Sequence, residues 1–190
     1  MRVLFAILLL TVPCSGADRM PRFADFPVTP IFPGSPGRPR FTSPPHLHPG
    51  RDIREGDLPP DADDRYRSSV EYDAKHGPNF AGHYTIALWS CGTGCSSMVV
   101  VDAKTGTLYR DVPFGTLDIN GNPAAKNHEY AGLRFRIDSS LLIVEGCRDA
   151  DFRRAKGERP DCSRSYFQWM VPGFKFLRKI PLSPPTWLLP

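Results

Sequence analysis

Length, composition and charge exclude several classes of protein. The chain has 190 residues, which suits one domain with tails. Its formal net charge of +4 falls to +3 if Arg2 is removed with a leader (4 − 1), and so mild an excess, in an exported chain, predicts no nucleic-acid partner. After the leader we expect no transmembrane segment, because no later segment is apolar for long enough to cross a bilayer.

The N-terminus has the features of a secretory signal peptide. Arg2 gives a positive start, and the apolar run from Val3 to Val12 is too short to span a hydrocarbon core of about 30 Å. Ala17 is a small residue where signal peptidase cleaves. We therefore expect residues 1–17 to be removed and the mature protein to be periplasmic or secreted.

Two alternatives to cleavage stay open. The segment could remain as an anchor, or Cys14 could become a lipidated first residue. Lipidation prefers an aliphatic residue and a small residue at the places that hold Thr11 and Pro13 here, so cleavage after Ala17 is favoured.

Residues 18–60 are dense in proline. Proline lacks an N–H and fixes φ near −65°, so this stretch cannot join a helix or an interior strand. It is predicted to be a disordered, partly polyproline tether or spacer. Its scattered apolar residues leave open that it docks on the domain or on a partner; they are Phe23, Phe26, Ile31, Phe32 and Phe41.

The folded domain is predicted over residues 61–181, with a tail at 182–190. Its first element is a short amphipathic helix from Asp63 to Lys75, which begins among aspartates that can act as N-caps. Apolar side chains four residues apart lie on one face of this helix, at Tyr66, Val70 and Ala74.

Beyond Gly82 the apolar pattern changes to a period of two, which is typical of half-buried strands. Short turns rich in Gly, Ser or Pro separate these segments, which predicts successive hairpins. The expected strands are 83–89, 98–101, 107–112, 133–137, 141–145, 166–170 and 174–180, with loops at 114–130 and 148–164. The fold class is therefore mainly β (α+β): an antiparallel meander of about six strands with one short covering helix and two disulfides.

The cysteines predict two disulfide bonds. The chain has five cysteines, and four remain once the leader with Cys14 is gone. An even number in an exported chain indicates paired sulfurs, with three possible connectivities. We favour Cys91–Cys95 and Cys147–Cys162, because both close short loops that contain Gly or Pro.

Several segments together resemble a family of uncharacterised exported bacterial proteins. The resemblance covers roughly residues 66–176 and implies a shared fold and export, but no established activity and no functional residues to transfer. It is carried by GPNFAGHYT at 77–85, WSCGTGC at 89–95, VDAKTG at 101–106, DSSLLIV at 138–144 and YFQW at 166–169.

His83 is the main candidate for catalysis, because histidine is the side chain whose charge changes near neutral pH. As a general base it would need a concave pocket and an acid such as Asp102 or Glu145. Asn79 is a candidate binding residue beside it. Alternatively, Asn79 turns the chain, Gly82 permits close packing and His83 is a strand residue satisfied by hydrogen bonds.

Two other patterns have stronger structural explanations. Cys91 and Cys95 could exchange disulfides, but a strand-to-strand turn lacks the helix N-terminus or cation that lowers a thiol pKa, so a structural bond is favoured. Residues 118–129 echo a calcium-binding loop, but Pro123 occupies the position that needs a sharp glycine turn. The histidines show no metal-ligand spacing. We expect no metal and no cofactor.

The 148–164 loop is basic, with candidate binding residues Arg148, Arg153 and Arg154. It could meet an anionic envelope polymer or an acidic protein, although interleaved acidic residues also fit a solvated loop. The leading hypothesis is a non-enzymatic exported binding or inhibitor-like envelope module with an unknown envelope or extracellular partner. The alternatives are a small exported hydrolase or transferase with a site around His83, and thiol–disulfide exchange at Cys91/Cys95.

Overall fold

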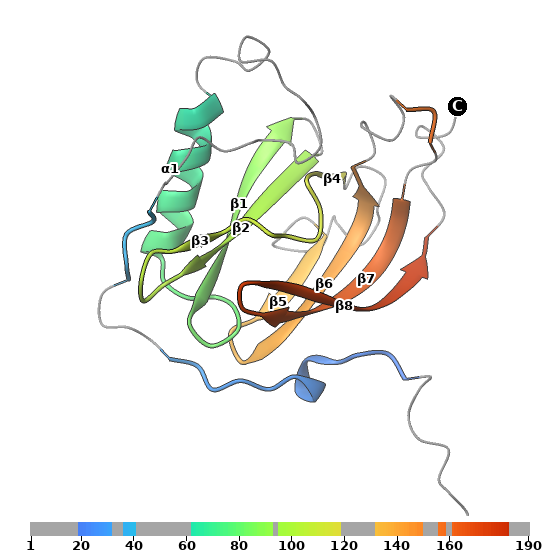
Figure 1. The fold of residues 1–190 in the computed structure, drawn as a ribbon, viewed down its shortest axis with the longest axis horizontal. Coiled ribbons are helices and arrows are strands. Elements are labelled where there is room, and N and C mark those ends of the chain that lie inside the picture. The colour runs from blue at the N-terminus through green and yellow to red at the C-terminus, as the bar shows by residue number, and fades with distance from the viewer. Residues whose placement is uncertain are drawn as a thin grey trace, which may run out of the picture.

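The computed structural model describes residues 19–31, 36–40, 62–92, 95–118, 132–149, 156–158 and 161–182, apart from the side chains of 62–65, 91–92 and 161. These residues form one α-helix, one 3-10 helix and an antiparallel sheet of eight strands (Figure 1). The elements are η1 (Phe23–Asp25), α1 (Ala62–Lys75), β1 (Tyr84–Gly92), β2 (Cys95–Asp102), β3 (Leu108–Tyr109), β4 (Leu117–Asp118), β5 (Leu133–Arg136), β6 (Ser139–Arg148), β7 (Asp161–Met170) and β8 (Gly173–Pro181).

The mainly β, antiparallel prediction is confirmed, but the strand order is not that of a simple meander. The strands follow the order β1-β2-β4-β6-β7-β8, while β3 pairs with β2 and β5 pairs with β6. The strand expected at 107–112 shortens to β3, and β4 forms inside the loop expected at 114–130. Strand β4 is held by only four residue pairs. It pairs with Cys95 and Ser96 of β2 on one side and with Cys147 and Arg148 of β6 on the other, and so joins the two groups of hairpins into one sheet.

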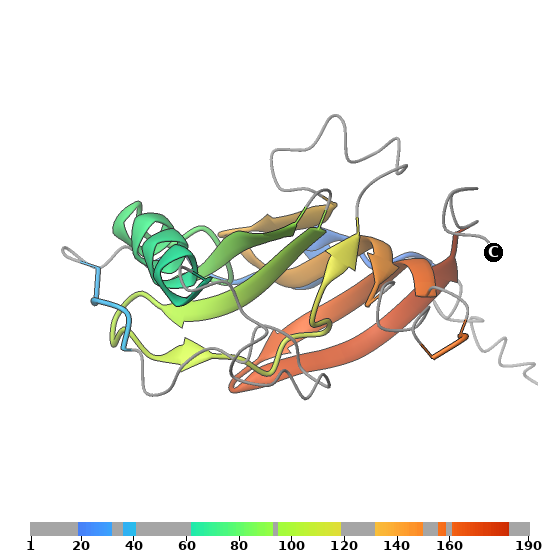
Figure 2. The same ribbon diagram turned by 90° about the horizontal axis from the view of Figure 1, so that it is seen from above.

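The sheet is curved, so that the β1–β2 half lies opposite the β7–β8 half (Figure 2). The main core fills the space between them, with Ile86, Val100, Leu142 and Phe167 from the two halves all buried. The two-residue alternation seen in the sequence therefore separates an inner face from an outer face on each strand.

Helix α1 covers the outer face of β1 and β2, as predicted. Tyr66 and Val70 pack against Val99 and Val101, and all four are at most 1% exposed. Met98 and Val100 alternate with these valines along β2 and belong to the main core instead. No helix in the described ranges is long and apolar enough to cross a membrane.

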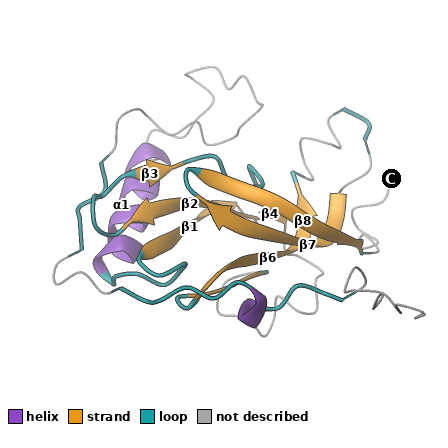
Figure 3. Ribbon diagram, turned by 60° about the horizontal axis from the view of Figure 1, so that its bottom comes forward, coloured by secondary structure: helices purple, strands orange, loops and turns teal. Residues whose placement is uncertain are grey.

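A third layer comes from the proline-rich segment. Residues 19–31 and 36–40, here called the N-terminal strap, run across the domain rather than forming a free tether (Figure 3). Phe23 and Phe26 pack on the outer face of the β6–β8 region, and Phe26 O accepts a hydrogen bond of 2.9 Å from Ser140 N. This outer face is apolar, so burying it against phenylalanine rings is favourable. The rest of residues 18–60 lies outside the described residues.

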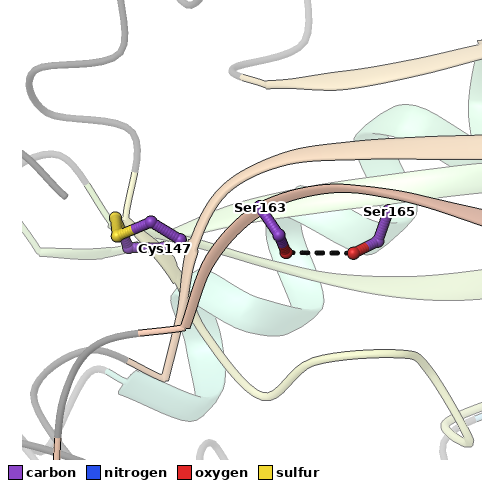
Figure 4. Close-up of a disulfide and its surroundings, with 4 residues drawn as sticks. Cys147, Ser163 and Ser165 are labelled. Carbon is purple, nitrogen blue, oxygen red and sulfur yellow. Dashed lines mark hydrogen bonds between the residues drawn. A yellow bond between two sulfur atoms is a disulfide. The ribbon is translucent and has the colours of Figure 1, made fainter. Parts of the chain in front are cut away.

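One of the two predicted disulfides is confirmed. Cys147 and Cys162 are directly opposite each other on β6 and β7, bonded with an S–S distance of 2.01 Å and nearly buried (Figure 4). Cys95 is also disulfide-bonded. The side chain of Cys91 lies outside the described residues, so the Cys91–Cys95 pairing stays a prediction.

Candidate functional sites

His83 lies just before β1, next to the turn that joins β2 to β3. Antiparallel pairing places Tyr84 opposite Asp102, which brings the His83 ring to the Asp102 carboxylate. The distance from His83 Nε2 to Asp102 Oδ1 is 3.7 Å, and the two side chains are 19% and 11% exposed. Of the two acids expected near His83, the structure therefore selects Asp102.

The same carboxylate already has a structural role in the turn. Asp102 Oδ1 accepts hydrogen bonds from the backbone N–H groups of Lys104 (2.8 Å) and Thr105 (3.3 Å). A separation of 3.7 Å is too long for a hydrogen bond to His83. Asp102 thus stabilises the turn through its hydrogen bonds, and its contribution to His83 is a nearby negative charge.

Burial is the main influence on the charge of His83. It lowers the pKa of the imidazole below the ordinary value of 6.5, the Lys104 ammonium lowers it further, and Asp102 offsets part of this. The neutral form of His83 therefore predominates at pH 7. A neutral imidazole can accept a proton, as a general base must. The neutral state of His83 is therefore compatible with a catalytic role and with a structural role alike.

The N-terminal strap is hydrogen-bonded to two backbone segments next to His83. Ile31 N donates to Gly82 O at 2.8 Å, and Gly37 N donates to Ala103 O at 2.6 Å. Gly82 has a φ of +87°, and a Cβ there would lie 3.0 Å from Thr29 O, so glycine is needed both for the backbone conformation and for close approach of the strap. The geometry around Gly82 and His83 therefore serves strap docking.

A pocket of about 590 Å³ lies between the strap and α1, lined by residues 36–39 together with Glu71, Ala74 and Lys75. His83 and Asp102 are not among its lining residues. In the ranges that the structure describes, no three His, Cys, Asp or Glu side chains are grouped as metal ligands. The calcium-like segment lies outside those ranges except for Asp118, which is in β4.

Asn79 uses its whole amide to close the free edge of β1. Its Nδ2 donates to Ile86 O at 3.1 Å, and its Oδ1 accepts from Ile86 N at 2.8 Å. A little further along, Asp73 of α1 accepts from Leu88 N at 2.9 Å. The two side chains imitate a neighbouring strand, and Asn79 is held there rather than offered to a ligand.

The ends of the loop expected at 148–164 are strands instead, with Arg148 in β6 and Arg164 in β7, so part of the expected basic surface belongs to the sheet. Arg148 places its guanidinium carbon 6.0 Å from the ring centroid of Phe167. Arg164 makes two hydrogen bonds, of 2.8 and 3.1 Å, to Glu145, whose side chain is 7% exposed. These bonds raise the pKa of Arg164. Arg153 and Arg154 lie outside the described residues.

The β7–β8 hairpin is a surface that the sequence analysis did not single out. Met170, Val171 and Phe176 are 54%, 55% and 53% exposed, which makes them half of the six exposed large hydrophobic residues that the structure describes. In the same hairpin, Trp169 and Phe174 pack with ring centroids 4.9 Å apart, and the Phe176 ring lies 5.7 Å from that of the buried Phe167. The exposed residues thus stand on a well-packed base.

Aromatic packing fixes this base to the other half of the sheet. The Trp169 ring lies 5.2 Å from Tyr84 and 5.4 Å from Tyr109, both in edge-to-face geometry. Edge-to-face pairs contribute about 0.5–1.5 kcal/mol each beyond their buried area. The hairpin is therefore presented as a preorganised surface.

Comparisons with known proteins add no relative. No protein family, no curated protein and no solved structure matches the chain. The resemblance of residues 66–176 to exported bacterial proteins consequently stays a prediction.

Proposed function

We propose that this chain is a non-enzymatic binding module that acts outside the cytoplasm, as an envelope or inhibitor-like protein. The observation that carries the proposal is the β7–β8 hairpin, which exposes more than half of Met170, Val171 and Phe176. Export is supported by the leader-like residues 1–17 and by the Cys147–Cys162 bond, since disulfides persist in oxidising compartments.

The hairpin fits binding because its apolar residues contribute to a surface rather than to the core. Met170 and Val171 are consecutive and both exposed at the hairpin end. Adjacent exposed apolar side chains mark interaction sites in soluble domains, whereas isolated ones need no explanation. Only Val171 and Pro172 lie beyond the last paired residues of the hairpin, Met170 and Gly173, and the next pair, Trp169 and Phe174, is packed ring against ring. Such a protruding, preordered element loses little conformational entropy on binding.

Retention on the cell-envelope fraction of the source organism tests this function. The purified mature protein is compared with a Met170→Ser/Phe176→Ser double variant and with Tyr72→Ser as the matched control. Tyr72 is 65% exposed on α1, so its substitution removes an exposed apolar side chain from another surface. We expect at least about a tenfold loss of retention for the hairpin variant alone, equivalent to 1.4 kcal/mol. Equal retention of all three proteins would refute the proposal.

A small hydrolase or transferase is the second candidate, favoured by the 3.7 Å approach of His83 to Asp102. It is weaker because the Asp102 carboxylate accepts two backbone hydrogen bonds of the turn. Its test is turnover of chromogenic ester, phosphoester and glycoside substrates by wild type and His83→Gln. Turnover that His83→Gln abolishes and Tyr72→Ser retains would establish catalysis; binding alone predicts no turnover in any of the three.

A further inference from the structure

The N-terminal strap is attached to the domain without entering its core. Each of its residues, 19–31 and 36–40, is at least partly exposed. Among the described residues, neither the main core nor the cluster beneath α1 includes a residue of the strap. Segments with few buried apolar contacts open separately from the rest of a domain. The strap can therefore leave the domain and return while the sheet stays folded.

The surface beneath the strap is shaped for this segment. The two phenylalanines of the strap, Phe23 and Phe26, pack on an apolar cluster of β6 and β7 whose members are at most 5% exposed: Leu141, Ile143 and Tyr166. The hydroxyl of Ser139 donates to Phe23 O at 2.9 Å and to Phe26 O at 3.0 Å. Pro27 also forms an antiparallel bridge with Ser139. The strap thus lies along the start of β6 as an added extended segment (Figure 3).

Turns of the domain hold the strap through its backbone. Val28 N donates to Asp138 O at 3.0 Å, and Arg40 N donates to Gly106 O at 2.8 Å. Gly106 has a φ of +75°, and a Cβ there would overlap Arg38 O, so the turn accepts the strap only with glycine at this position. The surface therefore selects residues 19–40 by backbone position as well as by the two rings, and any copy of the segment meets the same contacts.

The covalent link does not determine which domain the strap occupies. The 21 residues 41–61 separate the strap from α1. A chain of this length spans at most about 70 Å. A domain of about 120 residues has a radius of gyration of about 14 Å and hence a diameter of about 35 Å. A strap is thus within reach of its own domain and of the same face on a neighbouring copy.

The strap also has apolar side chains that its own domain leaves exposed. Met20 and Ile31 are 39% and 46% exposed, and they are two of the six exposed large hydrophobic residues that the structure describes. They flank the part of the strap whose phenylalanine rings pack on β6 and β7. A strap between two domains would bury its phenylalanines against one domain and bring Met20 and Ile31 to the other. The apolar area removed from water would favour the pair of domains.

We propose that two copies of the chain exchange straps, so that each strap lies on the β6–β7 face of the other copy and Met20 and Ile31 are covered at the interface. Exchange of an identical element is a low-cost route to a symmetric dimer, because each contact made within one chain is made again between two. A foreign segment would have to reproduce the ring spacing and the backbone contacts, whereas a second copy has both. The proposal is independent of the binding function above, whose exposed residues do not belong to this cluster.

The first experiment determines whose face a strap occupies. The photoreactive residue p-benzoylphenylalanine replaces Phe23 or, in a second protein, Phe26. Unlabelled and heavy-isotope-labelled forms of each protein are mixed equally at about 1 mM, the range of the effective concentration of a tethered segment, and irradiated after overnight incubation. Mass spectrometry identifies the crosslinks between strap and β6. Exchange predicts that up to about half of them join chains of different isotope.

The same photoreactive residue in place of Tyr72, which is 65% exposed on α1, measures crosslinks from random collision. If crosslinks between strap and β6 join chains of different isotope no more often than crosslinks from position 72 do, straps stay on their own domains and the proposal is wrong. Absence of any crosslink between strap and β6 from both strap positions would overturn it as well.

The second experiment measures the dimer dissociation constant by sedimentation equilibrium for wild type, Met20→Ser/Ile31→Ser and the matched control Tyr72→Ser. We expect the strap variant to dissociate at least about tenfold more readily and the control to match wild type. Both variants should keep the thermal midpoint of wild type, because the substituted side chains are exposed in the single chain. A protein that is monomeric at about 1 mM, or a dimer that the strap variant leaves intact, would overturn the proposal. Dimers that weaken as expected while all crosslinks stay within one isotope would mean contact without exchange, and exchange would be wrong.

Discussion

Removal of the Cys147–Cys162 bond is the perturbation whose magnitude follows most directly from the structure. The bond joins residues 15 apart in sequence. For a loop of this length the chain-entropy relation gives an entropy loss of about 10 cal/mol/K in the unfolded chain, or ~3 kcal/mol at 25 °C. Both cysteines are buried, at 4% and 6% exposure, so alanine replaces them without introducing an unpaired polar group.

The assay is urea unfolding followed by circular dichroism, in a Cys91→Ser/Cys95→Ser background that isolates this one bond. We expect the additional Cys147→Ala/Cys162→Ala change to lower the free energy of unfolding by ~3 kcal/mol. With a urea m-value of about 1–3 kcal/mol/M, the midpoint falls by about 1–3 M.

Reduction of the parent protein provides the control, because it opens the bond and keeps both sulfurs in place. Reduction and double substitution should agree within about 1 kcal/mol, the cost of small packing changes. A double variant as stable as the oxidised parent would show that the β6–β7 ladder alone holds these strands together, and would refute the loop-entropy reasoning.

Three further predictions concern stability and pH. Asn79→Ala should cost about 1–3 kcal/mol in urea unfolding, because it leaves the N–H and C=O of Ile86 without their partners, and a cost below about 0.5 kcal/mol would contradict the edge-closing role. Phe26→Ala should cost about 1–3 kcal/mol through loss of the strap's contact with the β6–β8 face, whereas Tyr72→Ala should change stability by less than about 0.5 kcal/mol; equal values would show that the strap does not stabilise the domain. The pKa of His83 in the folded protein lies below 6.5, so the unfolded state binds more protons as the pH falls. The contribution of His83 to the free energy of unfolding is therefore present above pH 6.5 and is lost as the pH falls through the folded pKa. Unfolding measured at pH 7.5 and pH 5 should therefore show a larger loss for wild type than for His83→Gln, and identical losses would be inconsistent with burial of a neutral ring.

The sequence predicts the hairpins well because their turns and periods are local. The VDAKTG segment provides the turn after β2, across which Val101 pairs with Leu108. The short connection between Gly92 and Cys95 joins β1 to β2, in the register that places Tyr84 opposite Asp102. Helix α1 begins and ends within a residue of its predicted bounds, since apolar spacing and flanking Asp and Gly residues define it. These features depend on neighbours in sequence.

Features that depend on distant contacts are not predictable in the same way. Strand β4 has only Leu117 and Asp118, too few residues to show any period, and it exists because β2 and β6 both pair with it. The strap has a composition that favours a tether, and only the apolar outer face of β6–β8 explains why it docks. In the sequence, Phe23 and Phe26 are the apolar residues that point to this docking.

The exposure of Phe176 shows a similar limit. Phe174 and Phe176 are two residues apart on β8, and a period of two predicts that both rings are buried on the inner face. Phe174 is partly buried in the core, but Phe176 is 53% exposed. Both residues are on β8, but the Phe174 ring packs against Phe80 and Trp169, whereas the Phe176 ring packs against Phe167. The difference in exposure follows from these distant contacts, which the local pattern does not contain.

A residue pair that the fold itself requires is weak evidence of function, and this criterion separates the two candidate sites. His83 and Asp102 come together because the β1–β2 register and the hydrogen bond from Ala103 N to His83 O, at 3.0 Å, leave them no other place. Their proximity would exist in a protein with no activity. The exposed side chains of Met170 and Val171 differ, because polar residues at these positions would leave the packing of Trp169 against Phe174 intact. Apolar identity that the fold does not need calls for an external cause, and contact with a partner is the one that the hairpin's geometry supplies.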